Sequence, residues 1–360
     1  MKFNPRRLGN DPASIALDWR IDNMSSPAPL LEVKNLSTHF LTDDGVMHAV
    51  EDVSFTLDRG QSLGLVGESG CGKTTTMLAL MRLLPPNGRI VKGQVLLEGR
   101  DLLRLPDSEM QRVRWSKISL IFQGAMNALN PVRTVGDQIA ESIRRHGLVG
   151  GRLDNHALDQ RVRQLLDMVG IASSRQDQYP HQYSGGMRQR AMIAMALACT
   201  PDVVIADEPT TALDVMIQAQ ILDLLQKLQR ELGLAVILIT HDLAVVAEMC
   251  DRVLVMYGGK VAEYADVDAI YNEPLHPYTR LLLAAFPDLT QPEGKLVAIP
   301  GYPPRLHALP AGCRFEPRCP VRIGKCVTAD PPLREVKPGH WVACHLVTEQ
   351  LPIHPTTSLP

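Results

Sequence analysis

Short apolar stretches alternate with longer amphipathic stretches along residues 30–266, which is the pattern of an α/β protein. LEVKNLSTHF (31–40) alternates apolar and polar positions, as a strand with one buried face does, and AVEDVSFTL (49–57) repeats that pattern. Other segments are short and almost wholly apolar, as buried parallel strands tend to be. These segments are SLGLVG (62–67), KISLIF (117–122), DVVIAD (202–207) and AVILIT (235–240).

The segments between the expected strands repeat their apolar residues with the period of a helix. The expected helices are 74–84, 134–146, 156–170, 186–199, 215–232 and 243–249. Strands that alternate with helices in this way predict an α/β fold with a buried, largely parallel sheet.

Both ends of the chain lack this pattern. Residues 1–29 are polar and rich in Pro and Ser, and we expect a flexible extension there, with Met24 as an alternative start. After Pro274 a short helix is expected in HPYTRLLLAAF (276–286), followed by proline-rich irregular chain to the end. The expected division is a large domain at 30–266 and a small, loop-rich C-terminal domain at 267–360.

Composition limits the partners and the cellular compartment that are expected for this chain. The chain has 360 residues, of which 45% are hydrophobic, and a formal net charge of −2, so it can form a core and gives no reason to expect a nucleic-acid partner. The best apolar run, MIAMALAC (192–199), is far shorter than the roughly 18–20 residues that cross a bilayer. Asp11 and Asp18 interrupt the apolar segment that a signal peptide needs. We therefore expect the chain to stay in the cytosol.

GESGCGKTT (67–75) fits the pattern G-x-x-x-x-G-K-[ST] and lies between an expected strand and an expected helix. The glycines let backbone N–H groups surround phosphate oxygens, and the helix presents its positive end. Lys73 is expected to reach the β- and γ-phosphates of a nucleotide, and the Thr74 hydroxyl to bind Mg²⁺. The expected phosphate-binding residues are Gly67, Ser69, Gly70, Cys71, Gly72, Lys73, Thr74 and Thr75.

VVIADEP (203–209) ends an expected strand on two carboxylates. Asp207 is placed to hold Mg²⁺, and Glu208 to polarise the water that attacks the γ-phosphate. Together with the phosphate-binding loop, this pair predicts hydrolysis of a nucleoside triphosphate.

Further elements identify the kind of nucleotide hydrolase. They are Gln123 after LIF, the glycine turn in YSGGMRQR (183–190), TALD (211–214) and His241 after AVILIT. In this order they resemble ATP-binding cassette proteins over about residues 30–270. The resemblance implies a P-loop NTPase cassette, with a RecA-like core, an antiparallel β subdomain and a helical subdomain.

The resemblance also implies roles for the matching residues. Phe40 would stack on adenine. Gln123, Glu208 and His241 would be catalytic, and Gln123 would bind Mg²⁺ together with Thr74 and Asp207. The remaining residues would act on the ATP site of a second subunit, so efficient hydrolysis is expected only in a dimer. These are Ser184, Gly185 and Gly186 at the phosphates and Asp214 across the interface.

Segments after the cassette narrow the resemblance to dipeptide and oligopeptide importer ATPases. The segments are EPLHPYTRLLLAAFP (273–287), IPGYPP (299–304) and GCRFEPRCP (312–320), with QGAMNALNP (123–131) inside the cassette. The resemblance implies a peripheral protein at the cytoplasmic face of the cell (inner) membrane. Its partners would be a second ATPase subunit (a copy or a paralogue), two transmembrane permease subunits that contact the region after Gln123 and, indirectly, an extracytoplasmic binding protein. Importers of nickel or oligosaccharides share this ATPase type, and a soluble cassette ATPase that remodels a macromolecule is a further alternative.

Four cysteines gather in the C-terminal segment. They are Cys313, Cys319, Cys326 and Cys344. In a reducing cytosol such clusters bind metal more often than they form disulfides. The spacing lacks the C-x₂-C pair of a zinc finger, whereas iron–sulfur clusters accept varied spacings of four cysteine ligands.

The subfamily resemblance also points to a [4Fe–4S] cluster on these cysteines. Zn²⁺ stays an alternative, as does the absence of any metal. His340 and His345 flank Cys344 and could replace one ligand in a zinc site, but we expect them to be surface residues. We expect the loss of Cys319 to unfold this segment while leaving the cassette able to bind ATP.

Overall fold

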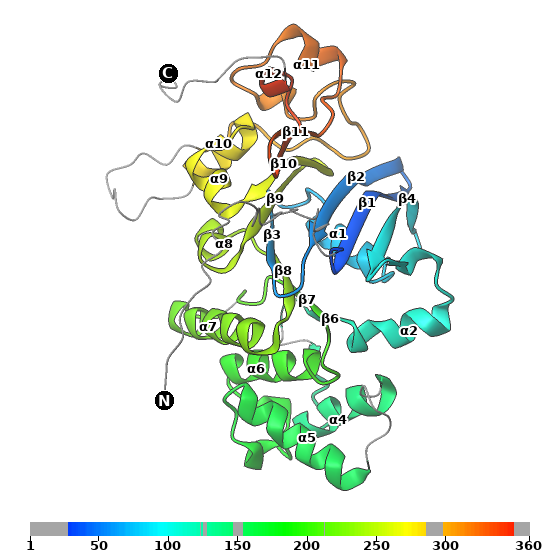
Figure 1. Ribbon diagram of the computed structural model, residues 1–360, viewed down its shortest axis with the longest axis vertical. Coiled ribbons are helices and arrows are strands. Elements are labelled where there is room, and N and C mark those ends of the chain that lie inside the picture. The colour runs from blue at the N-terminus through cyan, green and yellow to red at the C-terminus, as the bar shows by residue number, and fades with distance from the viewer. Residues whose placement is uncertain are drawn as a thin grey trace, which may run out of the picture.

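The computed structural model consists of two sheets, with helices packed around them (Figure 1). The larger sheet has the strand order β11-β12-β10-β9-β3-β8-β7-β6, and the smaller one has the order β2-β1-β4-β5. The mixed α/β architecture expected from the sequence is confirmed. The structure describes residues 28–122, 124, 128–146, 154–211, 213–285 and 298–348.

Five parallel strands form the centre of the larger sheet. They are β3 (Ser62–Val66), β6 (Ile118–Ile121), β7 (Val203–Asp207), β8 (Ala235–Ile239) and β9 (Arg252–Tyr257). Every residue of β3, β6, β7 and β8 is buried, since a parallel sheet of this kind is covered on both faces. The four apolar strands expected from the sequence are therefore confirmed, and β9 was not anticipated.

Three antiparallel strands extend this sheet into the C-terminal part of the chain. β10 (Lys260–Asp266) pairs with β9 and with β12 (His340–Val342), and β12 pairs with β11 (Arg334–Lys337). The expectation of irregular chain from the helix at 276–286 to the end was therefore wrong. Strands of three and four residues are too short to show a period in the sequence. Through β12, the C-terminal segment becomes part of the main sheet.

The smaller sheet is antiparallel and packs against the first helix. Its strands are β1 (Leu31–Thr42), β2 (Gly45–Leu57), β4 (Gly88–Leu97) and β5 (Arg100–Asp101), and the helix is α1 (Lys73–Leu80). Leu31, Val53 and Leu80 belong to one buried cluster between them. This sheet and the larger one hold the loop between β3 and α1 in place.

The expected helices are all present, with ends that differ by a few residues. α4 (Val135–His146), α5 (Asn155–Met168) and α6 (Gly185–Ala196) form a helical subdomain at one end of the molecule, opposite the C-terminal segment (Figure 1). The other expected helices are α7 (Val215–Leu232), α8 (Leu243–Met249) and α10 (Pro277–Ala284). Four further helices in the described part of the chain were not expected from the sequence: α2 (Asp107–Ser116), α9 (Val267–Asn272), α11 (Gly324–Thr328) and α12 (His345–Thr348). Within the described ranges, no helix has the length and apolar content to cross a membrane.

An aromatic group joins the C-terminal segment to the main core. Tyr278 of α10 is fully buried, and its ring centroid lies 4.6 Å from that of Tyr257 and 5.4 Å from that of Phe315. All three side chains belong to the core cluster that also contains Val66 at the end of β3. The C-terminal segment therefore packs directly behind the loop that follows β3.

Candidate functional site

The loop between β3 and α1 has the backbone that its glycine pattern requires. Gly67, Gly70 and Gly72 all have positive φ angles, which residues with side chains rarely adopt. A Cβ on Gly67 would lie 2.2 Å from the carbonyl oxygen of Met256, and one on Gly72 would lie 2.5 Å from that of Ala49. The loop packs against β9 and β2, and larger residues at Gly67 or Gly72 would push it away from these strands.

Lys73, the first residue of α1, points into this loop. Its side chain is buried, and Nζ donates hydrogen bonds to the carbonyl oxygens of Gly67 (2.7 Å) and Glu68 (3.0 Å). The ammonium group is thus held beside the loop, next to the positive N-terminal end of α1. An anion in the loop would meet both positive groups, as a phosphate does in loops of this type.

Thr74 and Asp207 come together from α1 and from the end of β7. The Thr74 hydroxyl donates a hydrogen bond to Asp207 Oδ2 over 3.3 Å. Burial raises the pKa of the Asp207 carboxyl and the charge of Glu208 adds to the rise, while the Thr74 hydrogen bond opposes it. A divalent cation would offset this electrostatic cost, so these two oxygen ligands fit the Mg²⁺ site expected from the sequence.

Glu208 has an unusual backbone and a fixed carboxylate. Its φ angle is +45°, and strained conformations of this kind in residues other than glycine gather at functional sites. His241 Nδ1 lies 3.2 Å from Oε1, and the Thr211 hydroxyl donates to Oε2 over 3.0 Å. A carboxylate oriented in this way can accept a proton from a water molecule beside it.

These residues share one pocket of about 490 Å³. Its wall consists of Met47, Ala49, Ser69, Gly70, Gly72, Lys73, Thr74, Thr75, Asp207, Glu208, Ile239, His241 and Leu306. The apolar members Met47, Ala49, Ile239 and Leu306 could not be assigned to the pocket from the sequence, because they belong to none of the phosphate-binding or catalytic motifs. Leu306 comes from the C-terminal segment, where its carbonyl oxygen accepts a hydrogen bond of 3.0 Å from the His48 N–H.

Among the described residues expected at the nucleotide, three do not line this pocket: Phe40, Gly67 and Cys71. Phe40 pairs with Gly88 of β4, and a Cβ on Gly88 would lie 2.9 Å from Phe40 Cε1. Gln123 lies outside the described residues. Met47 and Leu306 supply apolar surface at the pocket.

The Ser-Gly-Gly turn lies elsewhere on the chain. Ser184 caps α6 and accepts a hydrogen bond of 3.3 Å from the Met187 N–H, and its side chain is exposed. A Cβ on Gly186 would lie 2.7 Å from Ile217 Cγ2, so this position has room only for glycine. Ser184, Gly185 and Gly186 are not among the described residues that line the pocket of Lys73 and Asp207.

Asp214 begins α7 beside that turn. Its carboxylate accepts a hydrogen bond of 3.0 Å from the Ile217 N–H and thereby caps the helix. The next two side chains, Val215 and Met216, are 79% and 72% exposed.

A second hollow of about 700 Å³ lies between the helical subdomain and the segment that follows β6. Its lining includes apolar side chains such as Trp115, Phe122 and Met192 and charged ones such as Arg133 and Glu141. The full lining is Trp115, Phe122, Gly124, Ala128, Asn130, Arg133, Gln138, Glu141, Ser142, Arg145, His146, Met192 and Met195.

The four C-terminal cysteines are free thiols that lie near one another. Burial raises the pKa of Cys313 to about 12 and that of Cys319 to about 11, and the thiols of Cys326 and Cys344 add to both rises. In the described part of the chain, no three of these sulfur atoms lie within 4.8 Å of one another. Thiolates around one Zn²⁺ ion lie about 3.8 Å apart, given Zn–S bonds of about 2.3 Å. The group is therefore more open than a zinc site.

The two histidines that could replace a thiolate have other partners. His340 Nε2 lies 2.7 Å from Glu263 Oε1, and His345 Nε2 lies 2.9 Å from the carbonyl oxygen of Ala329. Both side chains are buried, so the expectation of surface residues was wrong, and their contacts attach the segment to its surroundings. This arrangement weighs against zinc coordination through either Nε2 atom.

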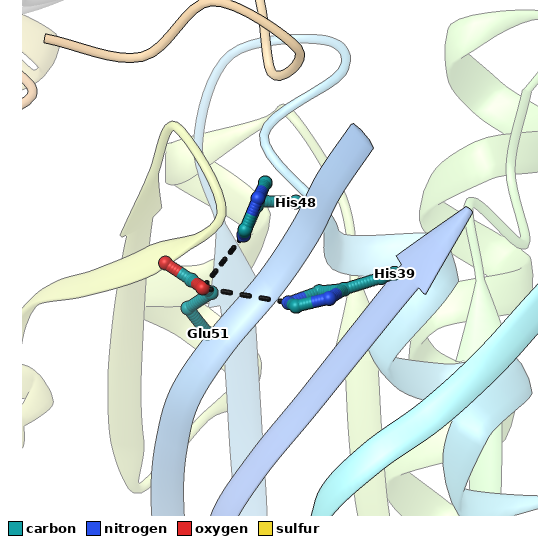
Figure 2. A group of neighbouring side chains, drawn as sticks. All are labelled: His39, His48 and Glu51. Carbon is teal, nitrogen blue, oxygen red and sulfur yellow. Dashed lines mark hydrogen bonds and ion pairs between the residues drawn. The ribbon is translucent and has the colours of Figure 1, made fainter. Parts of the chain in front are cut away.

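Figure 2 shows His39, His48 and Glu51, whose ring nitrogens and carboxylate converge at the ends of β1 and β2. His48 Nδ1 and His39 Nε2 lie 2.8 Å and 3.4 Å from Glu51 Oε1, and Arg314 binds the other carboxylate oxygen. Burial acts to raise the pKa of Glu51, but the His48 hydrogen bond and the charges of Arg314 and Lys260 outweigh it and lower the pKa. Two cations beside one carboxylate disfavour a third, so the group is an ion-pair network that joins the C-terminal segment to β2.

Comparisons with known proteins match both parts of the chain. Residues 50–211 match the family model described as "ABC transporter", and residues 262–326 match the one described as "Oligopeptide/dipeptide transporter, C-terminal region". The oligopeptide transport ATP-binding protein OppD of Salmonella typhimurium is 49% identical, over 89% of this chain and 95% of that protein. The dipeptide transport ATP-binding protein DppD of Bacillus subtilis is 48% identical, over 88% of this chain and 94% of that protein.

Solved structures of ATP-binding cassettes resemble the fold. A dimeric post-hydrolysis state of the cassette MJ0796 bound to ADP and Pi has 27% sequence identity and a TM-score of 0.58, over 66% of this chain and 98% of that one. CbiO1 from Clostridium perfringens, part of the transporter complex CbiONQ, has 28% identity and a TM-score of 0.58, over 68% and 91% of the two chains. The cassette fold implied by the sequence resemblance is thus confirmed.

Proposed function

The chain belongs to the ABC transporter family and carries the oligopeptide/dipeptide transporter C-terminal region, and from this we propose that it hydrolyses ATP to power peptide import through a membrane permease complex. The observation that supports ATP hydrolysis most strongly is the single pocket that holds Lys73, Thr74, Asp207 and Glu208. Peptide cargo is supported by the C-terminal region and by the names of relatives about 49% identical.

Each pocket residue has a role in this proposal. The N–H groups of the phosphate-binding loop and the Lys73 ammonium hold the β- and γ-phosphates. The Thr74 hydroxyl and the Asp207 carboxylate hold Mg²⁺, which neutralises phosphate charge when it is bound. Glu208 accepts a proton from the water that attacks the γ-phosphate, while His241 and Thr211 keep its carboxylate oriented.

The pocket is completed by a second ATPase subunit. In this proposal, the exposed Ser184 and the two glycines after it bind the γ-phosphate held by the partner, and Asp214 lies at the interface. The exposed side chains of Val215 and Met216 support this, since they would be buried between the two cassettes.

The permease binds in the hollow lined by Trp115, Phe122 and Met192. Phe122, which directly follows β6, lines this hollow, and the neighbouring strand β7 ends at Asp207, next to Glu208. A change at the phosphates would therefore reach the permease through adjacent elements. This assembly places the chain peripherally at the cytoplasmic face of the membrane.

The cargo is tested by uptake into vesicles that contain the chain, its permease partners and the binding protein, with ATP on the side of the ATPase. We expect labelled di- or oligopeptides to accumulate, and a nickel chelate or an oligosaccharide not to compete. Accumulation of nickel or oligosaccharide instead would keep the ATPase but contradict peptide cargo. Association with ribosomes and no solute uptake would favour the macromolecule-remodelling alternative.

We further propose that Cys313, Cys319, Cys326 and Cys344 hold a [4Fe–4S] cluster. The proposal rests on the ligand set: four cysteine thiolates are what such clusters bind, and the charges of Cys326 and Cys344 act on both Cys313 and Cys319. The segment around them has only short strands and helices, so a bound cluster would supply folding free energy that its small core lacks.

Protein purified without oxygen is expected to be brown and to contain about four irons and four sulfides per chain. Cys319→Ser should lose most of this iron and make the C-terminal segment sensitive to protease, because one ligand and its folding contribution are missing. Cys250→Ala, which removes a buried thiol of the cassette, is the matched control and should keep its iron. One zinc per chain without colour would contradict the cluster.

A further inference from the structure

Arg318 connects the cysteine segment to the phosphate-binding loop. It ends the short 3₁₀ helix Glu316–Arg318, directly before Cys319, and its side chain is only 4% exposed. Its two terminal nitrogens bind the carboxylate of Glu68, with Nη1 2.6 Å from Oε2 and Nη2 3.0 Å from Oε1. A bidentate pair of this kind fixes both position and orientation.

Residues that follow the cassette also hold the backbone of Glu68. Its N–H donates a hydrogen bond of 2.9 Å to the hydroxyl of Tyr278. Tyr278 is placed by the His-Pro-Tyr sequence at the start of α10, where His276 Nδ1 accepts a hydrogen bond of 3.0 Å from the Tyr278 N–H. Burial lowers the pKa of His276 to about 4, so its ring is neutral and can accept that bond. The side chain and the backbone of Glu68 are thus both fixed by residues beyond the cassette.

Glu68 in turn carries atoms that shape the loop. Its carbonyl oxygen accepts hydrogen bonds from Lys73 Nζ (3.0 Å) and from the Cys71 N–H (3.2 Å). The Glu68 side chain is not among the described residues that line the pocket. A shift of Glu68 would therefore reach a bound phosphate only through the loop backbone and the Lys73 ammonium.

We propose that Arg318 is a positioning residue for ATP binding, which holds the phosphate-binding loop through Glu68 and so makes ATP affinity depend on the intact cysteine segment. This inference rests on the proposed ATPase function. It also changes the expectation that loss of Cys319 leaves ATP binding intact, because the neighbouring Arg318 would lose its support. Cys319→Ser is now expected to weaken ATP binding as well.

The remaining contacts of Arg318 explain why a double substitution is needed. Nε donates to the carbonyl oxygen of Pro300 over 2.8 Å, and Nη1 donates to the Tyr257 hydroxyl over 3.2 Å. A single change of Arg318 therefore removes structural contacts together with the pair to Glu68. A double-mutant cycle with Glu68 separates these two effects.

The test is the affinity of the full-length chain for MgATP, measured by calorimetry and by displacement of a fluorescent ATP analogue. Arg318→Gln and Glu68→Gln are each expected to raise the Kd about tenfold, or about 1.4 kcal/mol. The double variant should lie within about twofold of either single variant, since both act through one pair. Arg318→Lys should recover only part of the affinity, because an ammonium group cannot form the bidentate pair.

Arg314→Gln is the matched control. Arg314 is the other buried arginine of this segment, and it pairs with Glu51 of β2 rather than with the loop. Its loss is expected to lower the unfolding temperature while leaving the Kd for MgATP within about twofold of wild type. Iron content measured in parallel shows whether the cysteine segment of each variant is intact.

The outcomes separate this inference from the proposed function. Wild-type protein that binds no MgATP would contradict the proposed function itself. Wild-type binding together with an unchanged Kd in both Arg318→Gln and Glu68→Gln would overturn the inference alone. Effects that add fully in the double variant would also overturn it, because they would assign the loss to general damage rather than to the pair.

Discussion

Glu208→Gln is expected to bind MgATP with nearly unchanged affinity while hydrolysing it at least about a hundredfold more slowly, the lower range for loss of a general base. The amide keeps the size of the side chain and can still meet the Thr211 hydroxyl and His241. It cannot accept the proton of the attacking water. The groups proposed to hold the phosphates and Mg²⁺ are the loop, Lys73, Thr74 and Asp207, and Glu208 is not one of them, so binding should survive.

The measurement is steady-state phosphate release together with the Kd for MgATP. Glu231→Gln is the matched control, because Glu231 is an exposed carboxylate on α7 paired only loosely with Lys227, at 3.8 Å. It should behave as wild type in both assays. Hydrolysis by Glu208→Gln within a few-fold of wild type would remove Glu208 from the role of base.

Gly185→Asp is expected to abolish hydrolysis in the assembled complex, at least about a hundredfold, without changing MgATP binding by the single chain. A carboxylate at this position would face the phosphates held by the partner cassette and repel them. Gly185 is the better choice for this test than Gly186, because its added Cβ would meet Leu213 at 3.4 Å, an ordinary contact, rather than Ile217 at 2.7 Å. An acidic residue in the first turn of α6 also favours the helix.

Comparison of the single chain with the complex provides the readout. We expect that Gly185→Asp leaves the Kd of the single chain for MgATP unchanged and that the complex loses hydrolysis. Gly185→Ala, which adds a methyl group without charge, is the control and should keep most of the activity. Full hydrolysis by the complex of Gly185→Asp would contradict a site shared between two cassettes.

The sequence predicted the charged and hydroxyl-bearing residues of the pocket well, because these residues lie just after the ends of strands. The loop after β3 and the carboxylates after β7 each follow a buried strand of the same parallel sheet, with β8 between them, and parallel strands end at the same edge of a sheet. Spacing along the chain was therefore enough to predict that Lys73, Thr74, Asp207 and Glu208 come together. Helices such as α7 were predicted well because they repeat their period over several turns.

The contributions of the C-terminal segment could not be predicted from the sequence. Leu306 reaches the pocket from a proline-rich stretch without periodicity, and Arg318 meets Glu68 across 250 positions. β12 is three residues long and gains its stability from pairing with β10. Contacts of this kind depend on tertiary packing, which leaves no local pattern in a single sequence.

The adenine-stacking role that the resemblance implies for Phe40 stays a prediction. Phe40 pairs with Gly88 of β4, and a Cβ on Gly88 would lie 2.9 Å from Phe40 Cε1. Its other partner is Met47 of β2, which lines the pocket. Side chains of directly paired residues point to the same face of a sheet, so Phe40 projects from the face that carries Met47.

The most direct test of the account is ATP hydrolysis by the complete complex, with and without peptide-loaded binding protein, for wild type and Glu208→Gln. The account predicts that peptide-loaded binding protein stimulates wild-type hydrolysis several-fold, and that the Glu208→Gln complex shows no stimulation. Hydrolysis that ignores every loaded binding protein, or that persists in Glu208→Gln, would contradict the claim that this pocket powers peptide import.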